Sequence, residues 1–229
     1  MARKSLTDGR CYPKAARVRF LANEHFVPQS EPASLDNGEI HVWFFPRWPD
    51  ARDSAKSPIV REWLARYLDT AVANVRVDVQ PNGKPRLHDG RLHFNVSHSG
   101  NAMLFAISRK QEIGVDLEFS RRPRRVVELA TRWFAPAEAA ALQVLPESLR
   151  QRAFLDLWTC KEAVLKANGD GIASGLHRIA FSMNETGEID SAIDRSWNVV
   201  RLEPGPGYPG AVAWQGPDVP IRTFVYTAR

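Results

Sequence analysis

The chain has 229 residues, which is enough to bury a large hydrophobic core in one or two domains. Its residues are 44% hydrophobic and 25% charged, a composition typical of a globular protein and not of a fibrous or disordered one. The formal net charge of +5 favours an anionic partner, without deciding between a nucleic acid, an anionic cofactor and an acidic protein. Two cysteines make no disulfide framework, no apolar run is long enough to cross a membrane, and no apolar secretory segment follows the basic N-terminus. We therefore expect a protein of the cytoplasm that does not enter the membrane.

The first elements are predicted after a long polar stretch. Residues 1–38 contain few bulky apolar side chains, and we expect them to form a poorly structured extension. Residues 40–45 read as a buried strand that ends at Pro46. Ser57 and Pro58 are typical of a helix start, and the apolar stripe that follows predicts a helix to Leu68.

Strands are predicted over 75–79, 92–97, 102–107 and 113–118, because apolar residues alternate or run together there. In the last of them, Asp116 and Glu118 project from the same face, since side chains of a strand repeat with a period of two. Four arginines follow directly: Arg121, Arg122, Arg124 and Arg125.

Helices are predicted from Val126, from Pro136 to Leu145, and from about Glu147 to Asn168, where Gly169 ends the last one. Further strands are expected between residues 177 and 227. On the long helix, Glu162 and Lys166 are four residues apart and share one face.

If strand 113–118 packs on the long helix, Asp116, Glu118 and Glu162 converge. Three unpaired carboxylates in a partly buried place repel one another and are costly to desolvate. Either they take up protons or a hard divalent cation holds them. Oxygen ligands with an open side suit Mg²⁺, which takes its other ligands from water and from the phosphates of a substrate.

The same residues carry a resemblance to a known family. Ile113-Gly-Val-Asp116 and Trp158-Thr-Cys-Lys-Glu-Ala-Val-Leu-Lys166, with residues 117–157 between them, resemble the signature of the 4′-phosphopantetheinyl transferases. Upstream, Asn82-Gly-Lys-Pro85 and Phe94-Asn-Val-Ser-His-Ser-Gly100 are similar to two further motifs of that family, in the same order. Because Asp116 lies in mid-chain, the chain resembles the longer, Sfp-type (group II) members.

The resemblance implies a fold. Sfp-type members are similar to a pseudo-dimer of two α/β lobes, and this chain repeats the order strand, helix, antiparallel strands. We therefore predict an α+β fold of two similar lobes, each a small, mostly antiparallel sheet packed on a long helix, with the active site between them. The predicted boundaries are 1–38 for the extension, 39–111 for the N-terminal lobe, and 112–229 for the C-terminal lobe with the Mg²⁺-binding motifs.

The resemblance also implies an activity, the Mg²⁺-dependent transfer of 4′-phosphopantetheine from coenzyme A to a serine of an acyl or peptidyl carrier protein. Asp116, Glu118 and Glu162 would hold the metal, and Glu162 and Lys166 would act in catalysis. Ser97, His98, Lys84 and Lys161 would contact coenzyme A. An ordinary surface ion pair is the alternative for Glu162 and Lys166, and a solvated turn residue is the alternative for Lys84.

One segment departs from the family pattern. The basic segment that grips the 3′-phosphate of coenzyme A is shortened or lost between residues 45 and 57. Arg52 falls where the arginine that contacts the 3′-phosphate would lie, and we predict that it has this role. Residues 1–38 are an alternative source of the contact.

The predicted partner is an acidic carrier protein, which the four arginines near residue 121 would attract. A solvated basic loop is the other interpretation of that cluster. The remaining alternatives are a nucleic-acid-binding module, which leaves the carboxylates unexplained, a Mg²⁺-dependent nucleotide hydrolase, which lacks its phosphate-binding loop, and a non-catalytic carrier-binding protein. We expect a monomer that binds no nucleic acid.

Overall fold

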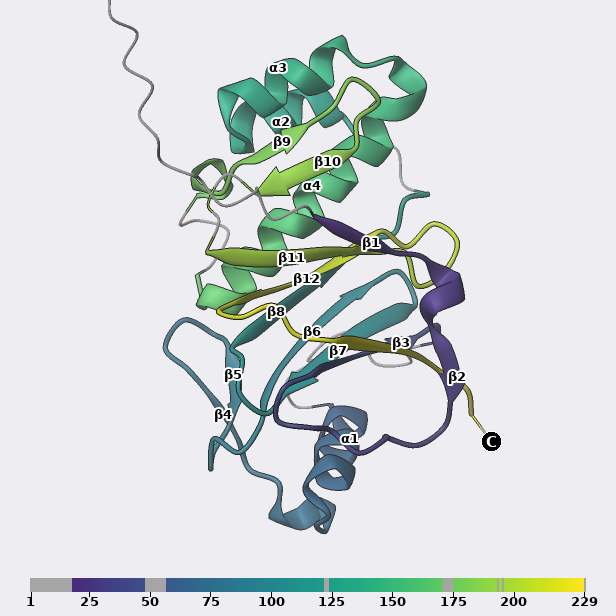
Figure 1. Cartoon of the computed structure of the whole chain (residues 1–229), viewed down its shortest axis with the longest axis vertical. Coiled ribbons are helices and arrows are strands. Elements are labelled where there is room, and N and C mark those ends of the chain that lie inside the picture. The colour runs from purple at the N-terminus through teal and green to yellow at the C-terminus, as the bar shows by residue number, and fades with distance from the viewer. Residues whose placement is uncertain are drawn as a thin grey trace, which may run out of the picture.

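The computed structural model describes residues 18–47, 57–121, 124–170, 175–192, 194 and 196–228. Two mixed sheets pack on each other through a shared core, and helices cover the outer face of each sheet (Figure 1). The predicted α+β fold of two lobes is confirmed.

The five-stranded sheet has the strand order β2-β13-β3-β7-β6. β13 runs parallel to β2 and β3, and the other pairs are antiparallel. Helix α1 (Pro58–Leu68) covers its outer face. The strands are β2 (Val27–Gln29), β3 (Ile40–Phe45), β6 (His93–Ser99), β7 (Ala102–Ser108) and β13 (Ile221–Tyr226).

The four-stranded sheet has the order β1-β11-β12-β8, with β1 parallel to β11 and the other pairs antiparallel. The long helix α4 (Glu147–Asn168) lies on its outer face. The strands are β1 (Arg19–Leu21), β8 (Ile113–Leu117), β11 (Trp197–Leu202) and β12 (Gly210–Gln215).

Smaller elements surround these layers. Helices α2 (Val126–Trp133) and α3 (Pro136–Val144) and the hairpin β9 (Phe181–Met183) to β10 (Ile189–Ala192) pack beside α4. The hairpin β4 (Val77–Val79) to β5 (Pro85–Leu87) flanks β6. The 3₁₀ turns are η1 (Asn23–His25), η2 (Val72–Asn74) and η4 (Leu176–Arg178).

Alternation along the strands explains why the layers stack. On β3, Trp43 and Phe45 contact the core under α1. Their neighbour Val42 contacts the four-stranded sheet instead, in the same core as Val115 of β8. Because both faces of β3 pack against apolar cores, this strand is buried along its whole length, including His41, as its mostly apolar sequence predicted.

Two predictions about the lobes need correction. β13, which the predicted boundaries place in the C-terminal lobe, pairs with β3 in the five-stranded sheet. Residues 18–38, predicted to be poorly structured, contain β1 and β2, and each of these adds a strand to one of the sheets. Residues 1–17 lie outside the described residues. In the part of the chain that the structure describes, no helix is both long and apolar enough to cross a membrane.

Candidate active site

Strand β8 and helix α4 touch at a glycine. A Cβ atom added to Gly114 would lie 2.1 Å from the carbonyl oxygen of Ala163 and 2.3 Å from the nitrogen of Ala167, both of which belong to the helix backbone. Only a residue without a side chain allows this approach. The close packing places Glu162 and Lys166 of α4 over Asp116, which is two residues after Gly114 on the same face of β8.

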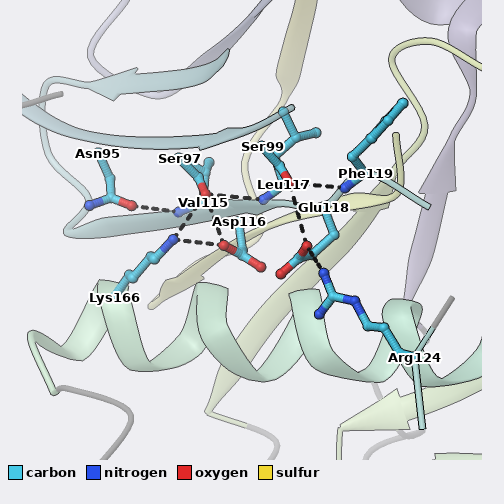
Figure 2. A network of polar contacts seen from close by, with 10 residues as sticks. All are labelled: Asn95, Ser97, Ser99, Val115, Asp116, Leu117, Glu118, Phe119, Arg124 and Lys166. Atoms are coloured by element: carbon cyan, nitrogen blue, oxygen red, sulfur yellow. Dashed lines mark hydrogen bonds and ion pairs between the residues drawn. The ribbon is translucent and has the colours of Figure 1, made fainter. Parts of the chain in front are cut away.

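Asp116 is the centre of a buried polar network (Figure 2). Lys166 Nζ donates to Asp116 Oδ1 at 2.7 Å, and the hydroxyl of Ser97 donates to the same oxygen at 2.9 Å. The other carboxylate oxygen, Asp116 Oδ2, is buried without a hydrogen-bond partner among the described residues, and so is Glu162 Oε1. Buried polar oxygens are seldom left unpaired, so a further ligand is indicated here.

Burial and neighbouring negative charge raise the pKa values of two of the carboxylates, Glu162 and Glu118. Burial raises the pKa of Glu162 to about 7, and the charges of Asp116 and Glu118 act in the same direction, against Lys166. Burial and the charge of Asp116 also raise the pKa of Glu118, against the effect of Arg124, which donates a hydrogen bond to it. Repulsion of this kind is what the sequence predicts for carboxylates that converge in a partly buried place.

The donor set fits a hard divalent cation by its chemistry. Asp116, Glu118 and Glu162 supply oxygens only, and two of these oxygens are buried and unpaired within the described part of the chain. The three side chains are not arranged as a complete metal site in the structure. Among the described residues, no group of three His, Cys, Asp or Glu side chains is close enough to hold a metal ion. Asp116 is instead paired with Lys166, and Glu118 with Arg124. A site of this kind, open on one side, suits Mg²⁺ with ligands from a bound phosphate.

Ser97 and His98 occupy opposite faces of β6, since they are neighbours on a strand. Ser97 is buried and bonds to Asp116. His98 is exposed and, by the alternation of the strand, lies on the side of Val96, which faces the core under α1. The side chains of Ser97 and His98 therefore point to opposite sides of the sheet, and only Ser97 joins the carboxylate network.

Lys84 links the β4–β5 hairpin to the end of α4. Its Nζ atom donates to Glu112 Oε2 at 2.7 Å and to the carbonyl oxygen of Ala167 at 2.8 Å, and only 8% of its side chain is exposed. A cavity of about 240 Å³ lies beside it and is also lined by Asn95 and Lys166. Two lysines thus border one cavity next to the carboxylates.

Lys161 does not reach this site, which corrects its predicted contact with coenzyme A. Its side chain is fully buried, and its Nζ atom lies 2.7 Å from Glu138 Oε2 and donates to the carbonyl oxygens of Leu176 and Ile179. Glu138 also accepts the backbone N–H of Phe181 at 2.9 Å. Lys161 therefore joins α4 to α3 and to the chain after η4, away from Glu162, because successive helix residues are about 100° apart.

Replacing Lys161 with methionine will destabilise the fold by about 3 kcal/mol, because it leaves the buried charge of Glu138 without its partner. Urea unfolding measures this loss. The double variant Lys161→Met with Glu138→Gln removes both charges and will recover part of the stability. A Lys161→Met protein as stable as the wild type, but with weakened coenzyme A binding, would restore the sequence-based role.

The basic residues predicted around the site divide into three groups. Arg52 and Arg122 lie outside the described residues. Arg124 bonds to Glu118 and so belongs to the carboxylate network. Arg121 and Arg125 are exposed, and Arg121 lies over the ring of Phe119 with 5.9 Å between its Cζ atom and the ring centroid.

Sequence reasoning missed the structural roles of Gly114, Asn95 and Glu138. A glycine inside a predicted strand is a usable signal for close backbone approach. Asn95 sits in a recognised motif, but its partner, the N–H of Val115, depends on how the two sheets meet. Glu138 has a local partner, the N–H of Ala135 at the start of α3, but its contacts with Lys161 and Phe181 lie 23 and 43 residues further along the chain and leave no local signal.

Comparison with known proteins matches the part of the chain that carries this candidate site. The sequence model of the 4′-phosphopantetheinyl transferase superfamily matches residues 112–213, which include β8 and α4. HetI of Nostoc sp., a 4′-phosphopantetheinyl transferase, is 34% identical over 222 residues, covering 89% of this chain and 93% of HetI. Sfp of Bacillus subtilis, with the same activity in its name, is 29% identical over 166 residues, covering 71% of this chain and 73% of Sfp. A putative 4′-phosphopantetheinyl transferase of Synechocystis sp. is 42% identical over 123 residues, covering 52% of this chain and 50% of the relative.

The protein is thus an enzyme of the transferase class. Because the match to HetI spans both lobes, the chain belongs to the 4′-phosphopantetheinyl transferase superfamily, and its similarity to Sfp confirms the predicted Sfp-type resemblance.

Proposed function

We propose that this protein transfers 4′-phosphopantetheine from coenzyme A to a serine of an acyl or peptidyl carrier protein and releases adenosine 3′,5′-bisphosphate. The observation that carries the proposal is the meeting of Asp116 on β8 with Glu162 and Lys166 on α4 in a network that leaves two carboxylate oxygens unpaired among the described residues. HetI, which is similar over nearly its whole length, is named a 4′-phosphopantetheinyl transferase.

The reaction requires the serine oxygen of the carrier to bond to the β-phosphorus of coenzyme A. The bond from that phosphorus to the bridging oxygen breaks, and its electron pair leaves with adenosine 3′,5′-bisphosphate. Glu162 is the candidate acceptor of the serine proton, because burial raises its pKa to about 7, which suits a general base near neutral pH. Lys166, 29% exposed and one helical turn away, is placed to contact the same phosphates.

Asp116, Glu118 and Glu162 would hold Mg²⁺. When bound, the cation would neutralise charge on the pyrophosphate, which favours departure of the nucleotide. Lys166 and Arg124 would then exchange part of their pairing with the carboxylates for contacts with phosphate, a change that long cationic side chains make readily.

The rest of coenzyme A would lie along the cavity beside Lys84 and Lys166. Lys84 would contact the adenylate part, although Glu112 and the end of α4 hold its ammonium group in the structure. The roles of His98 at the phosphates of coenzyme A and of Arg52 at its 3′-phosphate remain predictions, as do the cytoplasmic location and the monomeric state.

The test is the intact mass of an apo carrier protein after incubation with this protein, coenzyme A and Mg²⁺. We expect a gain of one phosphopantetheine group, which is lost when Mg²⁺ is omitted and a chelator is present. Controls without coenzyme A and without the protein exclude prior modification of the carrier.

Other outcomes separate the alternatives. No mass gain with any class of carrier, together with tight carrier binding, would indicate a non-catalytic binding protein. Breakdown of coenzyme A to adenosine bisphosphate in the absence of a carrier would indicate a hydrolase. Either result contradicts the proposal.

An acidic carrier surface suits the exposed arginines Arg121 and Arg125, which follow the carboxylate strand. Attraction between exposed charges is screened within about 10 Å at 0.1 M salt. The rate of transfer at low carrier concentration should therefore fall as salt is added in the same assay, and a rate that does not depend on salt would contradict an acidic partner.

A further inference from the structure

Three side chains of β6 bind the backbone of β8 where the two sheets meet (Figure 2). Asn95, Ser97 and Ser99 alternate along β6 and so point to one face. Each accepts a hydrogen bond from a backbone N–H of β8 or of the residues directly after it. The pairs are Asn95 with Val115 (2.9 Å), Ser97 with Leu117 (3.2 Å) and Ser99 with Phe119 (3.0 Å). We call these three bonds the side-chain ladder.

The ladder supplies acceptors for backbone N–H groups of β8 that would otherwise be buried without a hydrogen-bond partner. β8 is an edge strand, paired with β12 on one side only. On that side Glu118 donates its N–H to the carbonyl oxygen of Pro209 at 2.8 Å. The N–H groups of Val115 and Leu117 point away from β12, and both residues are buried. A buried donor without an acceptor is strongly unfavourable, so the side chains of β6 take the place of a neighbouring strand.

The two serine hydroxyls also reach the carboxylates. Ser97 accepts from the N–H of Leu117 and donates to Asp116, the residue before it. Ser99, two residues further along β6, makes the same two kinds of contact. Its hydroxyl accepts from the N–H of Phe119 and donates to Glu118 at 3.4 Å. The same spacing on both strands thus connects each hydroxyl to one backbone donor and to one candidate metal ligand.

The hydroxyl of Ser97 has no capacity left for a phosphate. It has one proton and two lone pairs. The proton is donated to Asp116, and the lone pairs accept from Leu117 and from Lys166 Nζ at 3.0 Å. A phosphate oxygen needs a donor, and the single donor of Ser97 is already used.

We propose that the side-chain ladder sets the position of β8 against the five-stranded sheet and orients Asp116 and Glu118, and that Ser97 is a positioning residue and not a ligand of the coenzyme A phosphates. Partners that orient the ligands of a metal commonly change metal affinity or activity by about 10- to 100-fold when they are removed. The part of the proposal that concerns metal and transfer rests on the proposed function. The part that concerns the backbone of β8 does not.

Amide hydrogen exchange, measured residue by residue by NMR on the full chain without coenzyme A, tests the ladder directly. In Ser97→Ala, the amide of Leu117 should exchange about 10-fold faster or more, whereas the amide of Glu118, which bonds to Pro209, should be unchanged. Ser97→Thr keeps the hydroxyl and should restore the wild-type rate. Ser99→Ala moves the effect to the amide of Phe119, which keeps the test available if Ser97→Ala does not fold.

Two further measurements separate positioning from coenzyme A binding. Calorimetry should show weaker binding of Mg²⁺ to Ser97→Ala, and kinetics should show kcat lowered by about 10-fold or more with the KM for coenzyme A unchanged. Equal acceleration of the Leu117 and Glu118 amides would contradict the ladder. An unchanged Leu117 amide with a raised KM for coenzyme A would make Ser97 a phosphate ligand and overturn the proposal, while the transferase activity itself would still stand.

Discussion

Replacing Asp116 with asparagine is expected to lower kcat/KM for transfer by about 10³-fold while leaving the protein folded. Asparagine has the same shape, and its amide oxygen can still accept from Lys166 and Ser97, which both bond to Asp116 Oδ1. Its nitrogen cannot bind a cation, so the unpaired carboxylate oxygen that we assign to the metal is lost. The substitution also removes a negative charge that raises the pKa of Glu162.

The measurement combines three readings on the same protein: the mass of the carrier protein over time, Mg²⁺ binding by calorimetry, and thermal unfolding. The matched control is Asp190→Asn, which makes the same substitution at an exposed position of β10. The control should transfer at the wild-type rate. Transfer at that rate by Asp116→Asn as well would remove Asp116 from the site and leave the metal proposal without its central ligand.

The sequence predicted the elements that carry the site because their signals are local. The alternation of Ile113, Val115 and Leu117 identifies β8, and the spacing of Glu162 and Lys166 identifies the face of α4 that meets it. The motif then fixes which strand and which helix belong together. For these residues, pattern and resemblance agree with the structure.

Lys161 shows where the same motif misleads. Resemblance gives its position in the chain but not the direction of its side chain. Helix α4 is covered by the four-stranded sheet on one side and by α2, α3 and β9 on another, so a lysine can be buried next to an active-site glutamate. Its partner Glu138 lies on another helix, and only the folded structure brings the two charges together.

The lobe boundaries failed for a related reason. β13 pairs with β3, although more than 170 residues separate them in the sequence, and β1 and β2 are too short to have a recognisable pattern. Pairing between distant strands leaves no periodic signal in either one. The last strand, β13, therefore belongs to the five-stranded sheet, together with the early strands β2 and β3. The N-terminal part of the described chain contributes to both lobes, because β1 lies in the four-stranded sheet and β2 in the five-stranded one.

The side-chain ladder depends on the same long-range arrangement. The alternation of Asn95, Ser97 and Ser99 with the apolar Phe94 and Val96 is visible in the sequence, and it would normally predict a strand with one face in water. In the structure that polar face lies against β8, where the three side chains accept backbone hydrogen bonds. The polar face of a strand can therefore contact a neighbouring edge strand, as well as solvent or a ligand.

The second large effect is expected at Gly114. Alanine at this position would place its Cβ 2.1 Å from the carbonyl oxygen of Ala163 and 2.3 Å from the nitrogen of Ala167. Both atoms belong to the helix backbone, so no side chain can move aside, and α4 itself must shift away from β8. We expect a loss of about 4 kcal/mol or more in the free energy of unfolding, because overpacking against backbone cannot be relieved locally.

The same shift should stop transfer even in molecules that stay folded. Lys166 and Glu162 are carried by α4 and Asp116 by β8, so moving the helix separates the two halves of the site. A displacement of about 1 Å is enough to reduce a rate by about 100-fold. Urea unfolding and the carrier mass assay measure the two effects separately.

Gly38→Ala is the matched control, since an added Cβ there has no atom within 4 Å among the described residues and the backbone needs no left-handed conformation. It should leave both stability and transfer at the wild-type level. Gly114→Ala with wild-type stability would mean that α4 and β8 separate at little cost. In that case the close contact at Gly114 would not be what brings Glu162 and Lys166 to Asp116, and the helix would have to be held over the carboxylates by the Lys166–Asp116 ion pair instead.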